Sequence, residues 1–110
     1  MDKYPEHFNR KTCMDIIAKN QNSLVKIVRK EIYDKVLKAL EACDIDVKYN
    51  FPEKLWYEHK VTLIKELLDN FGKVKVKTIN SQCEILKLIN DTNDIPRGTT
   101  HVIIEFVRDD

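Results

Sequence analysis

The sequence predicts an α+β fold: a long or kinked N-terminal helix packed on a small three-stranded open sheet, with a second helix on the same face. Two observations predict it. Apolar residues recur with a helical period from Met14 to Cys43, and from Asp44 they alternate at every second position. The chain has 110 residues, 43% of them hydrophobic, which suffices for one domain around one modest core. The expected order of elements is α-β-α-β-(α)-β.

We expect one domain, residues 1–110, in three parts. Residues 1–11 form an irregular leader, because this stretch is polar and contains Pro5. Residues 12–43 form the helical segment. Residues 44–110 form a strand-helix-strand-helix-strand unit.

The helical segment carries its apolar residues on one broad face. They are Met14, Ile17, Ala18, Leu24, Val28, Ile32, Val36, Ala39, Leu40 and Cys43. A single helix would be about 48 Å long, whereas a compact domain of this size has a radius of gyration of about 13 Å. Such a helix must project from the body and needs a partner. The alternative is a break within residues 20–23, where polar side chains could cap a second helix. The continuous apolar phase favours one helix or a mild kink.

The next two elements are a strand and a helix. Ile45, Val47, Tyr49 and Phe51 alternate with polar residues, which is typical of a half-buried strand. Pro52 then suits the first turn of a helix, and Gly72 suits a left-handed cap at its end. The apolar residues that we expect this helix to bury are Leu55, Trp56, Leu63, Ile64, Leu67 and Leu68.

The last part of the chain is less clearly patterned. Residues 73–79 alternate and predict a second strand, which could pair in parallel with the first across the intervening helix. Residues 81–84 (Ser-Gln-Cys-Glu) form a capping box, which favours a short helix over 82–90. A strand is the alternative there, because the run is short and rich in isoleucine and leucine. Residues 90–100 have loop composition, and residues 101–107 are the final strand.

Composition and charge restrict the function classes. The 19 basic and 18 acidic residues nearly cancel, so no overall field attracts the chain to nucleic acid or to an anionic membrane. No apolar run is long enough to span a bilayer. Cys13, Cys43 and Cys83 are an odd set without a close pair, which together with the polar start indicates reduced thiols and a cytoplasmic location.

We find no motif for catalysis, cofactor binding or metal binding. The histidines, His7, His59 and His101, do not stand at metal-ligand spacing from one another or from a cysteine. Gly72 and Gly98 stand alone, so there is no glycine-rich phosphate loop. The expectation is a non-enzymatic protein without a cofactor.

Four lysines are candidates for contact with an anion or nucleic acid: Lys48, Lys73, Lys75 and Lys77. Alternation would place three of them along one strand face, about 6.6 Å apart. Asp44, Asp46 and Glu105 should share that face, however, and the aromatic residues of the strands should point to the core rather than outward for base stacking. A solvated face of paired charges is therefore the favoured interpretation, and nucleic acid is the disfavoured one.

Protein binding is the better supported interpretation. Ile27, Tyr33 and Leu37 lie off the main apolar face of the first helix, where a small sheet cannot cover them. Together with the helix length, these three residues predict self-association, most simply as a dimer.

The order of these patterns resembles a group of short, uncharacterised proteins of tailed bacteriophages. The residues that carry the resemblance are the segment 18–22 (Ala-Lys-Asn-Gln-Asn), the strand 46–49, and residues 67–76 running through Asn70-Phe71-Gly72. The resemblance implies a viral context, in the host cytoplasm or in the virion, and assigns no role to any residue. It suggests an accessory protein that binds a host factor or inhibits a host defence. The alternatives are a minor virion component or a nucleic-acid-binding module that uses the Lys73, Lys75 and Lys77 strand.

Overall fold

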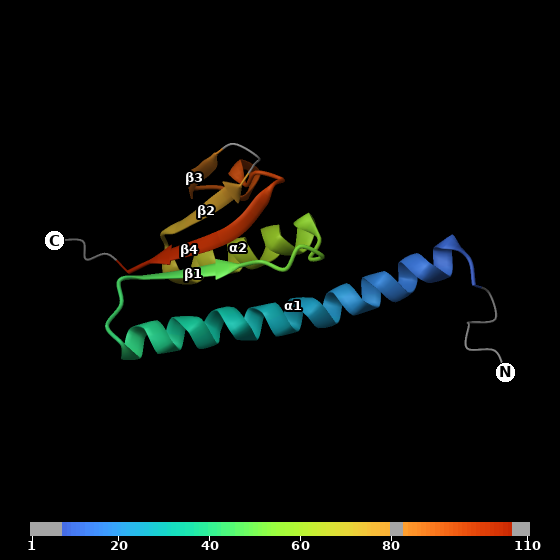
Figure 1. Cartoon of the computed structure of the whole chain (residues 1–110), viewed down its shortest axis with the longest axis horizontal. Helices are drawn as coiled ribbons and strands as arrows, with labels where there is room; N and C mark the ends of the chain where they lie inside the picture. The colour runs from blue at the N-terminus through green and yellow to red at the C-terminus, as the bar shows by residue number, and fades with distance from the viewer. Residues whose placement is uncertain (1–7, 80–82, 107–110) are drawn as a thin grey trace.

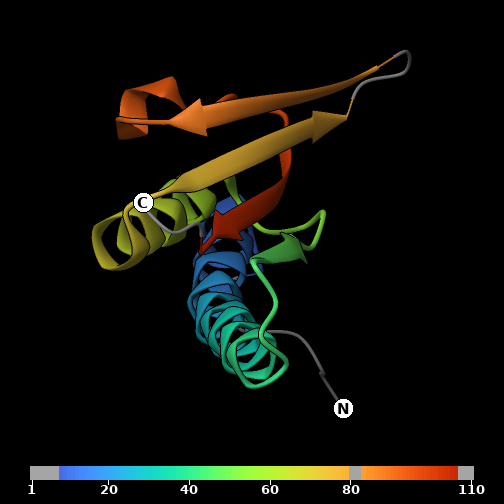
Figure 2. The same ribbon diagram turned by 90° about the vertical axis from the view of Figure 1, so that its left-hand side faces the viewer.

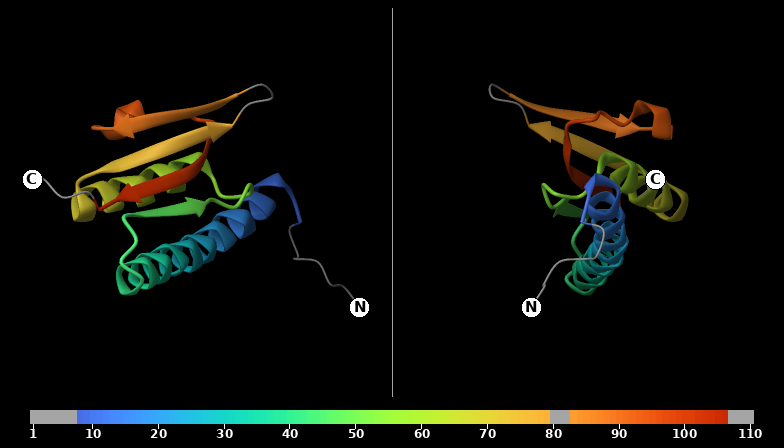
Figure 3. Two further views of the ribbon diagram at one scale, coloured as in Figure 1. Left: turned by 60° about the vertical axis from the view of Figure 1, so that its left-hand side comes forward. Right: turned by 90° about the vertical axis from the view of Figure 1, so that its right-hand side faces the viewer.

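In a computed structural model of the chain, residues 8–79 and 83–106 are described. Helix α1 (Arg10–Glu41) is followed by strand β1 (Asp46–Asn50) and helix α2 (Tyr57–Phe71). Strands β2 (Val74–Ile79) and β3 (Glu84–Ile89), a short 3-10 turn η1 (Thr92–Asp94) and strand β4 (Thr99–Glu105) complete the fold. Both helices lie on one side of the sheet, as Figures 2 and 3 show. The α+β class and the helices on one face are confirmed.

The sheet has four strands in the order β1-β4-β2-β3, and every neighbouring pair is antiparallel. The predicted direct pairing of the first two strands is therefore wrong. Strands β1 and β2 do run in the same direction, but β4 lies between them and pairs with both. With β4 between them, β1 and β2 each form an antiparallel ladder with β4 instead of a parallel ladder with each other, and antiparallel pairing is slightly more stable per residue.

The sequence predicted three strands because it favoured a helix over 82–90. Residues Glu84–Ile89 instead form strand β3, with Val74 opposite Ile89 and Ile79 opposite Glu84. Residues 81 and 82 of the predicted capping box lie outside the described residues. Strand β3 is an edge strand, and all of it except Ile89 is exposed. This explains its helix-like pattern: its side chains face no core that would impose an alternation.

Helix α1 is continuous over 32 residues, as the apolar phase favoured, and the alternative of a break within residues 20–23 is wrong (Figure 1). The helix begins at Arg10, where the Asn9 side chain accepts a hydrogen bond from the backbone N–H of Thr12 at 3.0 Å. It ends before Cys43, which has a φ of +59° and is exposed rather than part of the apolar face. The radius of gyration is 17.0 Å, well above the value of about 13 Å for a compact domain.

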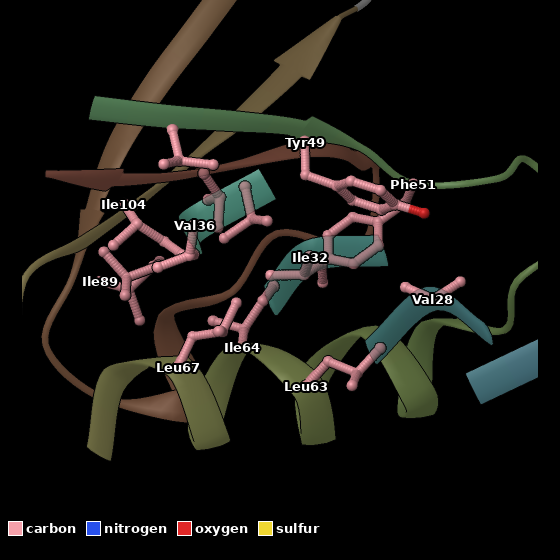
Figure 4. Packing of buried hydrophobic residues seen from close by; sticks show 14 of the residues in the cluster. Val28, Ile32, Val36, Tyr49, Phe51, Leu63, Ile64, Leu67, Ile89 and Ile104 are labelled. Atoms are coloured by element: carbon pink, nitrogen blue, oxygen red, sulfur yellow. The ribbon is translucent and has the colours of Figure 1, made fainter. Parts of the chain in front are cut away.

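The core lies between the sheet and the two helices (Figure 4). Ile32 of α1 stands at its centre, with the rings of Tyr49 and Phe51 on one side and the α2 residues Leu63 and Ile64 on the other. The opposite face of the sheet carries no helix among the described residues.

The core geometry predicts unequal effects of two truncations on α1. Ile32→Ala should lower the free energy of unfolding by about 2–5 kcal/mol, because Ile32 is 1% exposed and the core around it cannot collapse fully. Leu37→Ala is the matched control on the same helix, where 56% exposure predicts a change within about 0.5 kcal/mol. Urea unfolding followed by circular dichroism measures both, and equal losses would contradict this placement of the core.

Candidate protein-binding surface

The N-terminal part of α1, residues 10–20, extends past the sheet and α2 (Figure 1). The stripe that faces the core in the C-terminal half continues along this projecting part without a cover. Val28 and Ile32 are 0% and 1% exposed, whereas Met14 and Ile17 on the same side are 42% and 41% exposed. Apolar residues in such a row are usually covered by another element or another chain.

Gln21 marks the point where the covered part of α1 begins. Its side chain is 6% exposed and holds the segment that leads into α2. The Gln21 amide group donates to the backbone carbonyl of Lys54 at 2.8 Å, and its carbonyl oxygen accepts from the backbone N–H of Trp56 at 3.0 Å. Trp56 is the N-cap position of α2 and offers no side-chain cap of its own. Gln21 therefore satisfies one of the free N–H groups at the start of α2 from another helix.

A groove of about 530 Å³ lies beside this contact. Its apolar walls are Ile17, Leu24 and Ile27 from α1, and Trp56 closes it on the side of the body. Asn20, Ser23 and Lys54 supply a polar rim. On α1 the groove runs from Ile17 to Ile27, about 15 Å along the helix.

The sequence placed Trp56 in the core, but the structure leaves it half-buried at the groove. Its ring stacks on that of His59, with 5.9 Å between ring centroids and 5° between planes. A tryptophan held in one orientation beside an apolar groove provides a large contact area at small entropic cost. Sequence reasoning missed Gln21 and Trp56, because the first looked like a helix breaker and the second like an ordinary core residue.

The three residues predicted for self-association do not form one surface. Ile27 is 54% exposed and lines the groove. Leu37 is 56% exposed, but it lies ten residues further along α1 and about 80° around the helix from Ile27. Tyr33 packs on Phe71 with ring centroids 6.2 Å apart, and its hydroxyl accepts a hydrogen bond from the Asn70 side chain at 2.8 Å. Of the three, Ile27 alone belongs to the groove.

The lysine strand forms a face of paired charges. Lys75 contacts Glu105 at 2.7 Å, and Lys77 contacts Glu84 at 3.0 Å. The neighbouring ammonium of Lys77 lowers the pKa of Lys48, and the contact with Lys77 lowers the pKa of Glu84. Lys73 is exposed before β2. Because acidic residues already accompany these lysines, the open face has little excess charge to attract a phosphate backbone.

The other residue types considered in the sequence are the strand aromatics, the potential metal ligands and the histidines. Tyr49 and Phe51 are buried at 4% and 3% exposure, so the strand aromatics point to the core as the sequence predicted. Within the described ranges, histidine, cysteine and acidic side chains do not gather into a group that could hold a metal ion. No helix in these ranges is long and apolar enough to cross a membrane. His7 lies outside the described residues.

Comparisons of the chain with protein-family models, with curated proteins and with solved structures found no match.

Removal of the Gln21 side chain should destabilise the protein more than its position on a projecting helix suggests. Gln21→Ala leaves the carbonyl of Lys54 and the N–H of Trp56 without their partner, which costs about 1–3 kcal/mol in the free energy of unfolding. Asn20→Ala, at the exposed neighbouring position, should change it by less than about 0.5 kcal/mol. Urea unfolding gives both values, and fluorescence of the single tryptophan reports whether the segment has moved. Equal stabilities of the two variants would show that the Gln21 contact has no structural role.

Proposed function

We propose that this protein acts by binding other protein chains through the groove on α1, and that its first partner is a second copy of itself. The observation that carries the proposal is the row of exposed apolar residues that continues the core stripe of α1 past Gln21. A helix laid into an apolar groove is a common mode of protein recognition. In a monomer the projecting part of α1, residues 10–20, would expose this row to water.

The segment 10–31 of α1 is self-complementary in an antiparallel arrangement. If two α1 helices cross with the dyad between Asn20 and Gln21, Ile17 of one copy meets Leu24 of the other, and Met14 meets Ile27. The same register brings Arg10 opposite Glu31, both of which are exposed. The resulting interface is isologous, because each contact occurs twice across the dyad.

The positions of other charges agree with this register. Lys19, Lys26 and Lys30 are exposed and lie roughly 120–160° around α1 from Leu24. They would therefore lie on the outer side of each helix, and the lysines of one copy would be far from those of the other. In the same arrangement the sheet and α2 of each copy would lie beside the projecting part of the other α1. Trp56 of one copy would then cover part of the apolar row of the second copy.

This proposal agrees with the expected non-enzymatic role as an accessory protein. The lysine face offers a weaker case for nucleic acid, because Lys75 and Lys77 already have acidic partners. The bacteriophage context, and the choice between a host-directed binder and a virion component, stay predictions. Affinity capture from infected cells would separate them, since host proteins and particle proteins would be recovered in the two cases.

Self-association is tested by a charge placed in the groove. Sedimentation equilibrium in the tens of micromolar range should give the dimer mass for the wild-type chain. Ile17→Glu should shift the dissociation constant upward by at least about tenfold, because the new carboxylate would be buried without a partner in the dimer. Ile17 is 41% exposed in the monomer, so the variant should keep its fold, and circular dichroism checks this.

Leu37→Glu is the matched control, since Leu37 is on the same helix, similarly apolar and away from the groove. It should leave the dimer mass unchanged. A monomeric wild-type chain would refute self-association itself. A dimer that survives Ile17→Glu and is lost in Leu37→Glu would place the interface on the other side of α1.

A further inference from the structure

A second cleft lies at the end of the sheet, apart from the groove on α1. It has a volume of about 690 Å³ and forms where β1 ends and β4 begins. Segments 49–53 and 97–101 supply most of its lining, and Lys60 of α2, Ile79 of β2 and Glu31 of α1 complete it. The proposed binding through α1 involves Glu31 of this lining, opposite Arg10 of the second copy, and none of its other residues.

Lys60 is the unusual residue of the cleft. Its Nζ donates a hydrogen bond to the backbone carbonyl of Thr99 at 2.9 Å and lies 5.9 Å from the ring centroid of Phe51. Burial lowers the pKa of Lys60. Within residues 8–79 and 83–106, no carboxylate forms an ion pair with Lys60. A half-buried ammonium is normally accompanied by a counter-charge, so this one lacks its usual complement.

A second cation lines the same cleft. The guanidinium of Arg97 lies 5.2 Å from the ring centroid of Tyr57, which precedes Lys60 by three residues on α2. Arg97 is exposed and likewise forms no ion pair with a described carboxylate. An arginine stacked on an aromatic ring keeps its donors free for a planar anionic group.

Two acidic residues line the cleft without neutralising these cations. The carboxylate of Glu31 accepts a hydrogen bond from the Tyr49 hydroxyl at 2.9 Å, and Glu53 is exposed. Neither contacts Lys60 or Arg97 as an ion pair. Pro52 and Ile79 add apolar surface, and Ile79 is 45% exposed.

We propose that this cleft binds a small organic anion, with its phosphate or carboxylate group on Lys60 and Arg97 and its apolar part against Pro52 and Ile79. The ligand oxygens would replace the missing counter-charge of Lys60, and the volume admits a molecule with a ring. Size, apolar wall and few convergent polar groups are the usual features of small-molecule sites.

Phenyl phosphate is the probe for this site, and amide NMR of the ¹⁵N-labelled full chain is the measurement. Saturable shifts should be confined to the residues around Lys60 and the 97–101 segment. Benzoate in place of phenyl phosphate distinguishes a carboxylate from a phosphate preference. Inorganic phosphate should bind at least about tenfold more weakly, because it lacks the apolar part.

The deciding variant is Lys60→Met, which keeps an unbranched side chain one atom shorter and removes its charge. It should weaken phenyl phosphate binding at least about tenfold, as expected for loss of a charge-assisted hydrogen bond. Lys65→Met, at an exposed position on the same helix, is the matched control and should leave the affinity unchanged. Equal affinities of wild type and Lys60→Met, or shifts spread over surface lysines without saturation, would overturn the proposal.

The fold of Lys60→Met should survive. Because the pKa of Lys60 is lower in the folded chain than in the unfolded chain, its protonated form opposes folding at neutral pH. The variant should therefore be at least as stable as wild type at pH 7. The wild-type chain should gain stability through the alkaline range in which folded Lys60 has lost its proton and unfolded Lys60 retains it. Thermal unfolding at pH 7 and in that range checks both expectations, and a destabilised variant at pH 7 would contradict an uncompensated charge.

Discussion

The two hydrogen bonds of Gln21 to the backbone of Lys54 and Trp56 determine how the parts of this protein fit together. They join α1 to the start of α2, and they do so from a side chain that is almost fully buried. A buried amide must have its donor and acceptor satisfied, so these two hydrogen bonds fix the position of the 54–56 segment along the axis of α1. That position sets where the core ends and where the uncovered part of the helix begins.

The elongated shape follows from this arrangement. The sheet and α2 cover one face of α1 from Gln21 to Ala39, and the buried residues of this face are Gln21, Val28, Ile32, Val36 and Ala39. The same helix continues for eleven residues on the N-terminal side of Gln21, with apolar side chains on the same face. The helical hydrogen bonds continue through that part of α1. A projecting helix with an apolar stripe beside Trp56 is well suited to contact another chain.

Charge is distributed in two contrasting ways on the rest of the surface. On the open face of the sheet, lysines form ion pairs with acidic residues, as Lys75 does with Glu105 and Lys77 with Glu84. At the end of the sheet, Lys60 contacts the Phe51 ring and the Thr99 carbonyl, and no carboxylate of the described residues forms an ion pair with it. The lysines of the ion pairs on the open face already have counter-charges within the chain. Lys60 leaves a positive charge in a cleft, which is the basis for expecting an anionic ligand there.

The sequence by itself determined the class of the fold, the first two strands and the end of α2 at Gly72, because each follows from local periodicity or from a capping residue. It favoured a continuous first helix but left a break within residues 20–23 open. It also placed the first turn of the second helix at Pro52, which is wrong, because α2 begins at Tyr57. Tertiary structure decided the rest. Strand β3 carries a local helix signal and becomes a strand because β2 offers it a ladder of hydrogen bonds, from Val74 with Ile89 to Ile79 with Glu84. The insertion of β4 between β1 and β2 depends on pairing between segments far apart in the chain, which no local pattern encodes. The role of Gln21 is the clearest example: in the sequence it is one of four polar residues that could end a helix. Only the backbone of the 54–56 segment, thirty-three to thirty-five residues away, gives its side chain the partners that make it part of the core.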